Sequence, residues 1–140
     1  MDANTILIEK NFQIGLFSPN CSSGLAVTKI PERWSRNWED NLRLARLADE
    51  VGIDFLLPIA RWIGYGGDTS FHEGVLDPTI WATGLLTQTQ RITVFATIHT
   101  AFNHPIVVAK QLATADQIGH GRIGLNIVAG GTNQNTIHLV

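Results

Sequence analysis

The chain has very little cysteine, with Cys21 the single one among 140 residues. One cysteine excludes a disulfide within the chain and a metal site built from several thiolates. A lone unpaired thiol is typical of proteins in a reducing compartment. We therefore expect a cytoplasmic protein.

Charge is also sparse. Charged residues make up 16% of the chain, the formal net charge is -2, and the ten Lys and Arg are scattered. No basic patch therefore marks a surface for nucleic acid or an anionic membrane. No apolar run approaches the roughly 18 residues that a membrane-spanning helix needs. The start, MDANTILIEK, lacks the pattern of a signal peptide. The sequence predicts neither nucleic acid nor a membrane as a partner.

A glycine-rich phosphate turn is missing where a dinucleotide-binding fold needs one. The first segment with strand character, FQIGLFS, runs into SPNCSSGLAV. This continuation has no G-x-G-x-x-G motif and no immediate helical pattern. A Rossmann-type domain is therefore disfavoured.

The sequence does contain four short apolar segments rich in β-branched and aromatic residues: FQIGLFS, GIDFLLPIA, ITVFATIH and RIGLNIVAG. Continuous apolar runs are typical of strands covered on both faces of a parallel sheet. Helical patterns separate them, so the order βαβαβαβ predicts an α/β fold with right-handed crossovers.

Capping residues and apolar spacing mark three helices. The first, from Trp38 to Val51, has Asn37 as N-cap and Gly52 to end it. Its expected buried stripe has i, i+3, i+4, i+7 spacing and consists of Leu44, Leu47, Ala48 and Val51. The second helix opens at PTIWATGLLTQ after Asp77, and the third at IVVAKQLATADQI after His104 and Pro105, with Val108, Leu112 and Ala115 on one face.

The connections between these elements are strongly asymmetric. Helix-to-strand links are short, whereas strand-to-helix links include about twenty residues at 18–37 and about seventeen at 61–77. Ligands of open α/β sheets and of (β/α)8 barrels bind at the carboxyl ends of the strands. We expect the functional site there. A barrel takes about 250 residues, so four βα units fit roughly its first half.

Several of these stretches resemble a known family. HPIVVAKQLATADQIGHGRIGLNIVAG is similar to the third helix and fourth strand of the bacterial-luciferase-like flavin-dependent monooxygenases. GLFSPNCSSGLAVTKIPERW and GIDFLLPIARWIGYGG resemble the branch containing alkanesulfonate, dimethyl sulfone and pyrimidine monooxygenases. The resemblance implies a TIM (β/α)8 barrel that holds reduced FMN at the carboxyl end of its strands. Oxygen then forms a peroxyflavin that oxygenates a small organosulfur or related compound, and a separate flavin reductase supplies the reduced flavin.

The resemblance covers only the amino-terminal half of such a barrel. Family members continue after the fourth strand with a GWN-like turn, whereas residues 131–140 read GTNQNTIHLV. We therefore interpret residues 1–140 as a partial luciferase-like barrel domain with a divergent tail at 131–140. The expected protein is a truncated form of the enzyme.

Four residues are expected to contact the flavin because they match family segments at the strand ends: Ala60, Arg61, Thr97 and Asn126. Asn126 is a polar amide inside an apolar strand, where it needs hydrogen-bond partners. Arg61 offers a fixed cation to the negatively charged pyrimidine end of reduced flavin or to an anionic substrate. An arginine exposed in the loop remains the alternative.

His99 is the candidate catalytic residue. It points the same way as Thr97, because side chains alternate along a strand, and it is expected to donate a proton or to steer the peroxide. A purely structural, hydrogen-bonded histidine is the alternative.

The loop RWIGYGGDTSFHEGVLD is expected to cover the substrate and exclude water, with Trp62, Tyr65 and His72 as substrate contacts. The alternative is an ordinary surface loop whose glycines form turns. His72 and Glu73 lack further ligands at metal-binding spacing, so no metal site is expected.

Three readings of the whole protein stay open. The first is the FMN-dependent monooxygenase acting on a small molecule. The second is a non-catalytic half-barrel remnant or an association-dependent subunit, since open sheet edges favour a homo-oligomer. The third is a deazaflavin-dependent oxidoreductase, which shares the fold.

Overall fold

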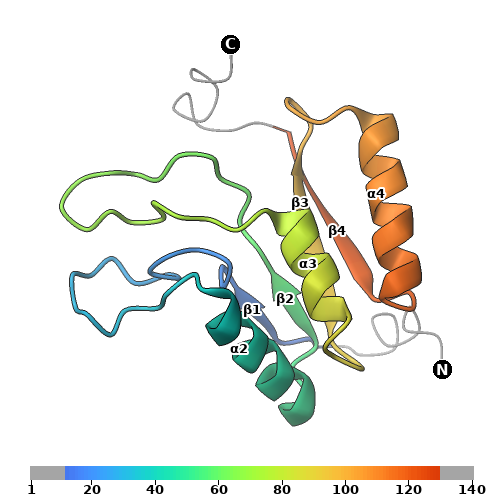
Figure 1. Ribbon diagram of the computed structural model, residues 1–140, viewed down its shortest axis with the longest axis horizontal. Helices are drawn as coiled ribbons and strands as arrows, with labels where there is room; N and C mark the ends of the chain where they lie inside the picture. Colours follow the sequence, from blue (N-terminus) through green and yellow to red (C-terminus); the bar gives the residue numbers. More distant parts are fainter. Residues whose placement is uncertain (1–11, 130–140) are drawn as a thin grey trace.

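The four apolar segments pair side by side into one parallel sheet. The computed structural model describes residues 12–129, and its strand order is β1-β2-β3-β4 (Figure 1). The strands are β1 Gly15–Phe17, β2 Phe55–Leu57, β3 Thr93–His99 and β4 Ile123–Val128. The helices are α2 Trp38–Val51, α3 Pro78–Leu86 and α4 Pro105–Ile118. The predicted parallel βαβαβαβ order is confirmed, and the predicted tail at 131–140 lies outside the described residues.

All three helices cover the same face of the sheet (Figure 1). This follows from the strand order, because right-handed crossovers between sequential neighbours place every helix on one side. The core between the layers joins Ala45 and Ala48 of α2, Leu85 of α3 and the strand residues Leu56 and Val94. None of the helices in residues 12–129 is long and apolar enough to cross a membrane.

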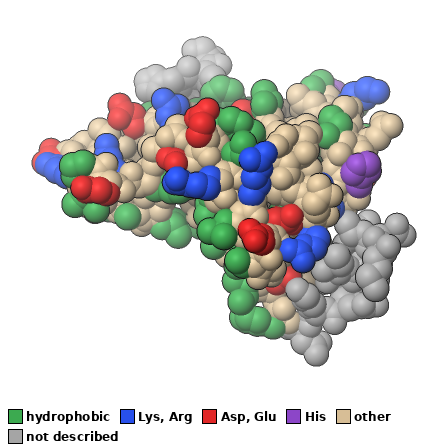
Figure 2. All heavy atoms as spheres, turned by 60° about the horizontal axis from the view of Figure 1, so that its bottom comes forward, with side chains coloured by type: hydrophobic (Ala, Val, Ile, Leu, Met, Phe, Trp, Pro, Cys, Tyr) green, Lys and Arg blue, Asp and Glu red, His purple; other side chains and the backbone are tan. Residues whose placement is uncertain are grey.

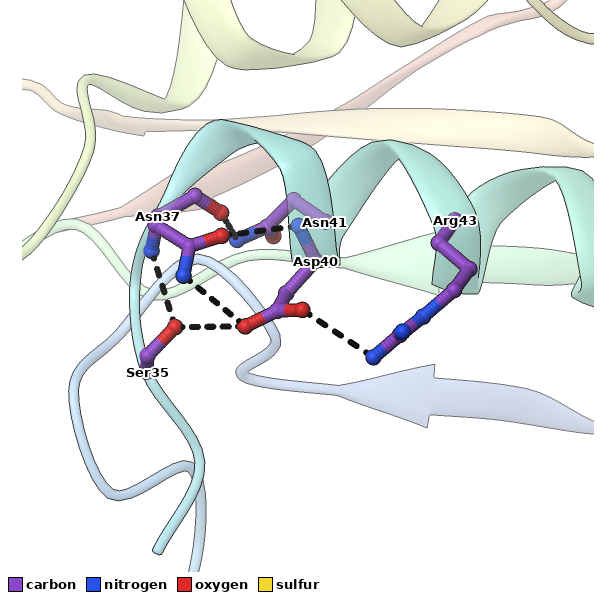
Figure 3. Close-up of polar contacts among 5 residues, drawn as sticks. All are labelled: Ser35, Asn37, Asp40, Asn41 and Arg43. Atoms are coloured by element: carbon purple, nitrogen blue, oxygen red, sulfur yellow. Dashed lines mark hydrogen bonds and ion pairs between the residues drawn. The ribbon is translucent and has the colours of Figure 1, made fainter. Parts of the chain in front are cut away.

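The amino terminus of α2 is fixed by a polar cluster (Figure 3). Asn37 Oδ1 accepts a hydrogen bond from the Asp40 backbone N–H at 2.8 Å, as an N-cap should. The Asp40 carboxylate in turn accepts bonds from Ser35 Oγ at 2.7 Å and from Arg43 at 3.0 Å. Gly52 ends the helix in the left-handed conformation at φ 84°. Both predicted caps are confirmed.

The buried face of α2 differs from the predicted stripe. Leu47 is 54% exposed and Val51 66% exposed. Ala48 of the predicted stripe is buried, and the helix also buries Ala45 together with the polar residues Asn41 and Asp49. Asn41 accepts a hydrogen bond from Trp81 Nε1 at 2.9 Å, so a satisfied amide occupies a position that an apolar pattern cannot reveal.

Polar side chains tie together the amino-terminal end of the sheet. The Asp49 carboxylate accepts from the backbone N–H groups of Gln90 at 2.8 Å, Arg91 at 2.8 Å and Ile92 at 2.6 Å. The buried Arg122 guanidinium donates to Thr89 Oγ1 at 2.9 Å and to two backbone carbonyls. In barrel folds this end contributes stability and the opposite end carries function.

The second face of the sheet, away from the helices, carries aromatic rings packed over glycines. A Cβ at Gly15 would lie 2.1 Å from the Phe55 ring, and one at Gly124 would lie 2.6 Å from the Phe95 ring. The two rings meet edge to face at 5.6 Å. Both glycines are therefore needed because a neighbouring ring fills the space of their side chain.

On the face of the molecule shown in Figure 2, acidic and basic side chains are interspersed. No block of one sign lies there, as the sparse and scattered charge of the sequence indicates.

Candidate functional site

β2 ends early because its next residue cannot continue the hydrogen-bond ladder. Pro58 has no backbone N–H, and paired β2 residues extend only to Leu57. β3 runs on to His99, and its side chains take over where the backbone pairing stops. Thr97 Oγ1 donates to the Pro58 carbonyl at 2.7 Å, and His99 Nε2 lies 2.8 Å from the Ala60 carbonyl.

The segment between these two carbonyls is held from the other side by Asn20. Its Nδ2 donates to the Ile59 carbonyl at 2.8 Å and to the Leu76 carbonyl at 3.0 Å, while its Oδ1 accepts from Ile59 N–H at 2.9 Å. Asn20 is completely buried. We call Asn20, Thr97 and His99 the carbonyl clasp. It fixes the backbone of residues 58–60 directly before Arg61.

Asn126 extends this polar row onto β4. It is the register partner of Thr97, and its Nδ2 donates to Thr97 Oγ1 at 3.2 Å. Because the Thr97 hydroxyl gives its proton to the Pro58 carbonyl, it receives from Asn126. The structure thus brings the predicted residues Ala60, Thr97, His99 and Asn126 together at one end of the sheet.

Arg61 combines burial with unused hydrogen-bonding capacity. One terminal nitrogen donates to Tyr65 OH at 2.7 Å, and the guanidinium lies 4.0 Å from the centre of the Tyr65 ring. Its Nε and Nη1 are buried without a hydrogen-bond partner. Within residues 12–129 it forms no ion pair. Buried donors of this kind are rare in proteins and indicate a place for an acceptor.

A cavity of about 250 Å³ opens beside these residues, at the carboxyl ends of β2 and β3. The predicted residues that line it are Ala60, Arg61, Trp62, Thr97 and His99. Asp77, Asn103 and Gln111 add further polar groups to the wall. The site therefore combines a cation, amides and an imidazole in one hollow.

The two long loops are joined to each other, as their neighbouring positions in Figure 1 show. Cys21 and Val75 form an antiparallel bridge, and the Ser22 N–H donates to the Gly74 carbonyl at 2.8 Å. His72 Nε2 lies 2.6 Å from the Gly24 carbonyl. Residues 18–37 and 61–77 therefore form one lobe beyond the carboxyl ends of β1 and β2.

The three residues predicted to contact the substrate differ in their exposure to solvent. Trp62 and Tyr65 are 62% and 53% exposed, whereas His72 is buried and stacks on Phe71 at 3.8 Å. Burial lowers the pKa of His72, the charge of Arg61 lowers it further, and only the bond to the Gly24 carbonyl opposes them. His72 therefore joins the two loops as a neutral imidazole, and it does not line the cavity.

Cys21 and metal ligation offer no chemistry in this region. The Cys21 side chain is fully buried, and burial raises the pKa of its thiol. A thiol that is kept protonated is a poor nucleophile. The part of the chain that the structure describes contains no cluster of three or more His, Cys, Asp or Glu side chains that could hold a metal.

Asn20 was not predicted as a site residue, although its hydrogen bonds link both loops to the segment after β2. Its position two residues after the Leu57-bonded Ser18, in a polar run following a strand, was the available signal. Nothing in the local pattern specifies that its partners lie 39 and 56 residues further along the chain.

A parallel α/β sheet in sequential strand order, with polar residues and a cavity at the carboxyl ends of its strands, is typical of (β/α)-barrel enzymes. The sequence profile described as "Luciferase-like monooxygenase" matches residues 12–138. The chain belongs to the luciferase-like monooxygenase family.

Individual relatives agree with this assignment. Pyrimidine monooxygenase RutA of Caulobacter vibrioides is 33% identical over 118 residues, which cover 84% of this chain and 33% of that protein. The RutA of Rhizobium rhizogenes is 34% identical, over 84% of this chain and 32% of that protein. The chain thus spans about a third of the length of the curated relatives it matches.

Solved structures show the same fold. The crystal structure of riboflavin lyase RcaE, with modified FMN and riboflavin, superposes with a TM-score of 0.74 at 27% identity, covering 90% of this chain and 31% of that one. EDTA monooxygenase EmoA from Chelativorans gives a TM-score of 0.76 at 22% identity, covering 89% and 30%. The four strands and their helices superpose on part of the TIM barrel of these enzymes.

Proposed function

We propose that this chain forms the flavin-contacting part of an FMN-dependent monooxygenase. Family membership and the barrel architecture support a monooxygenase, and the geometry at the strand ends supports reduced FMN as the ligand. The observation that carries the proposal is the half-buried guanidinium of Arg61, with two donors that have no partner in the described protein.

The ligand that satisfies Arg61 must present acceptors and, best of all, negative charge. The pyrimidine end of reduced FMN has both, because one of its two carbonyl groups lies next to an anionic ring nitrogen. Charge-assisted bonds from a guanidinium edge match such a group in direction and charge. The residues present therefore fit the cofactor.

Asn126 and Thr97 fit the polar edge of the same ring. Asn126 keeps its amide oxygen and one N–H beyond the bond that it makes to Thr97. Thr97 orients Asn126, since its own proton is committed to the Pro58 carbonyl. We propose that Ala60 contacts the ring through the backbone that the carbonyl clasp holds in place.

Bound reduced FMN would supply the electrons and the site at which oxygen is activated. The chain itself would orient the ring and exclude water. Trp62 lines the cavity, and Tyr65 contacts Arg61 from the same segment, which has glycines at 64, 66 and 67. We propose that Tyr65, which covers one face of the Arg61 guanidinium, moves aside when the ligand binds and then covers it.

The substrate is proposed to be a small polar molecule. Organosulfur compounds are the expected class. The 33% sequence identity with pyrimidine monooxygenase RutA makes pyrimidines a second candidate class. A separate reductase would deliver reduced FMN in the cytoplasm. An activity assay can distinguish these classes. The chain is supplied with a flavin reductase, NADH and oxygen, and product formation is measured with uracil, methanesulfonate or dimethyl sulfone as the substrate.

Flavin binding tests the proposal directly. The purified chain is titrated anaerobically with reduced FMN, and in parallel with reduced deazaflavin. Arg61→Gln should weaken FMN binding at least about tenfold, because each charge-assisted bond contributes about 1.5–3 kcal/mol. Arg43→Gln, an exposed charge on α2, is the matched control and should bind normally. Absence of binding up to about 1 mM FMN, an affinity below about 4 kcal/mol, contradicts the proposal.

Exposed apolar side chains favour a second property, association. Phe17 on β1 is 49% exposed, and Leu125 and Ile127 on β4 are 44% and 63% exposed. Both strands lie at the edges of the sheet. Such edges favour pairing with a second strand edge, so we propose that this unit works as a homo-oligomer. Native mass spectrometry of the purified chain tests this, and a monomer at micromolar concentration contradicts it.

A further inference from the structure

We infer that His99 is a positioning residue, which holds the backbone of Ala60 through its Nε2–H group and does not transfer a proton. The inference rests on the proposed function, because Ala60 and Arg61 are the segment that we propose to contact the flavin. It replaces the sequence-based expectation of His99 as a proton donor.

The position of His99 follows from the unequal lengths of two neighbouring strands. Backbone pairing between β2 and β3 covers only Phe55–Thr93 and Leu56–Val94. Beyond that point, Thr97 and His99 point the same way from β3 and reach the carbonyls of Pro58 and Ala60 in turn, at 2.7 and 2.8 Å. Side-chain hydrogen bonds therefore connect β3 to the chain after β2, where the backbone pairing of the two strands has ended.

The hydrogen-bonding partners of the imidazole indicate its tautomer. A carbonyl oxygen can only accept, so the Nε2 atom facing Ala60 carries the proton in the neutral ring. The opposite ring nitrogen, Nδ1, is buried and has no hydrogen-bond partner in the described part of the chain. Among residues 12–129 the imidazole therefore has one hydrogen-bond partner, the carbonyl of Ala60, and no second protein group to exchange a proton with. The ring is therefore built to hold a carbonyl.

The backbone of His99 is itself fixed. Asn103 Nδ2 donates to the His99 carbonyl at 2.8 Å, and the side chain of His99 is 6% exposed. A buried ring on a fixed strand end restricts the position of the Ala60 carbonyl, to which it is hydrogen-bonded. Arg61 follows directly, so a shift of Ala60 would misdirect its guanidinium.

Two substitutions of His99 distinguish the roles of its two ring nitrogens. In His99→Gln the side-chain amide reaches the place of Nε2 and can still donate to the Ala60 carbonyl. In His99→Asn the shorter amide reaches only the place of Nδ1, so the bond to Ala60 is lost. Both variants remove the imidazole and every proton transfer that it could perform, which makes them a matched pair.

The full chain is used for two measurements: anaerobic reduced-FMN affinity and hydrogen exchange of the Ile59 amide, with urea unfolding as the check on folding. We expect His99→Gln to keep wild-type affinity and exchange. His99→Asn should bind about tenfold more weakly and exchange Ile59 faster, since it leaves a buried carbonyl unpaired. Equal behaviour of the two variants, or loss in His99→Gln alone, overturns the inference.

Failure of the proposed function would look different. If the wild-type chain takes up no flavin, the proposed function fails and the Ile59 exchange still decides the role of His99. Faster exchange in His99→Asn than in His99→Gln then supports the positioning role, and equal exchange overturns it. If wild type binds flavin and the two variants bind equally, only the inference on His99 fails.

Discussion

Replacing Asp49 by Asn should destabilise the fold strongly although it changes only one atom. Oδ1 of Asp49 accepts from the Arg91 and Ile92 N–H groups, and Oδ2 accepts from the Gln90 N–H. An amide keeps one acceptor oxygen, so at least one of these three donors would face an NH2 group. The other two bonds would lose the charge of the acceptor. A lost buried bond and two weakened ones together cost about 2–4 kcal/mol.

Thermal and urea unfolding measure this cost. A loss of that size should lower the melting temperature by about 6–12 °C in a chain of this length. Asp116→Asn, on the exposed side of α4, is the control and should change little. Equal unfolding midpoints for the two variants would refute the reasoning, because they would show that the three backbone bonds contribute nothing.

The same carboxylate should also make stability depend on pH. Burial alone would raise the pKa of Asp49, but the backbone N–H groups of residues 90–92 and the charge of Arg91 lower it below its ordinary value. A carboxyl whose folded pKa is depressed stabilises the fold above its unfolded pKa, about 3.9. That contribution should disappear as the pH falls below this value, and Asp49→Asn should lack this part of the acid dependence.

Three further predictions concern packing, capping and the loop lobe. Gly124→Ala should cost about 1–3 kcal/mol in urea unfolding, because its Cβ would lie 2.6 Å from the Phe95 ring; an unchanged midpoint would contradict the packing of that face. Asn37→Ala should cost about 1 kcal/mol by the same measurement, whereas Asn37→Asp keeps the cap and should not. His72 has a lowered pKa, so the unfolded chain takes up its proton first and stability should fall as the pH drops below about 6.5. His72→Gln keeps a donor for the Gly24 carbonyl and should flatten that pH profile; an unchanged profile would show that His72 does not control it.

Local signals in the sequence were sufficient for the order and ends of the elements. Asn37 and Gly52 were predicted to bound α2, and Asp77 and His104 to cap the next two helices, as the structure confirms. Capping acts over two or three residues, so a pattern in the sequence contains it completely. The ladder of β2 is shorter than its apolar run because Pro58 interrupts it.

Long-range contacts could not be predicted in the same way. The apolar spacing on α2 favoured Leu47 and Val51 as buried residues, but small alanines and two satisfied polar residues form the buried face. The contacts of Asn20 with Ile59 and Leu76, and the joining of the two loops, depend on how the chain is folded in space. The residues at the strand ends were found through the family resemblance, whereas the bonds that hold them became apparent only in the structure.

The central claim is that the carboxyl ends of these strands hold a reduced flavin. Backbone amide chemical shifts, recorded by NMR while reduced FMN is added anaerobically, test it most directly. If the flavin binds there, the largest shifts should occur at residues 59–62, 97–99 and 126–128. Shifts concentrated instead in the groove between α3 and α4, around Thr83 and Lys110, would contradict it, as would the absence of any shift at saturating FMN.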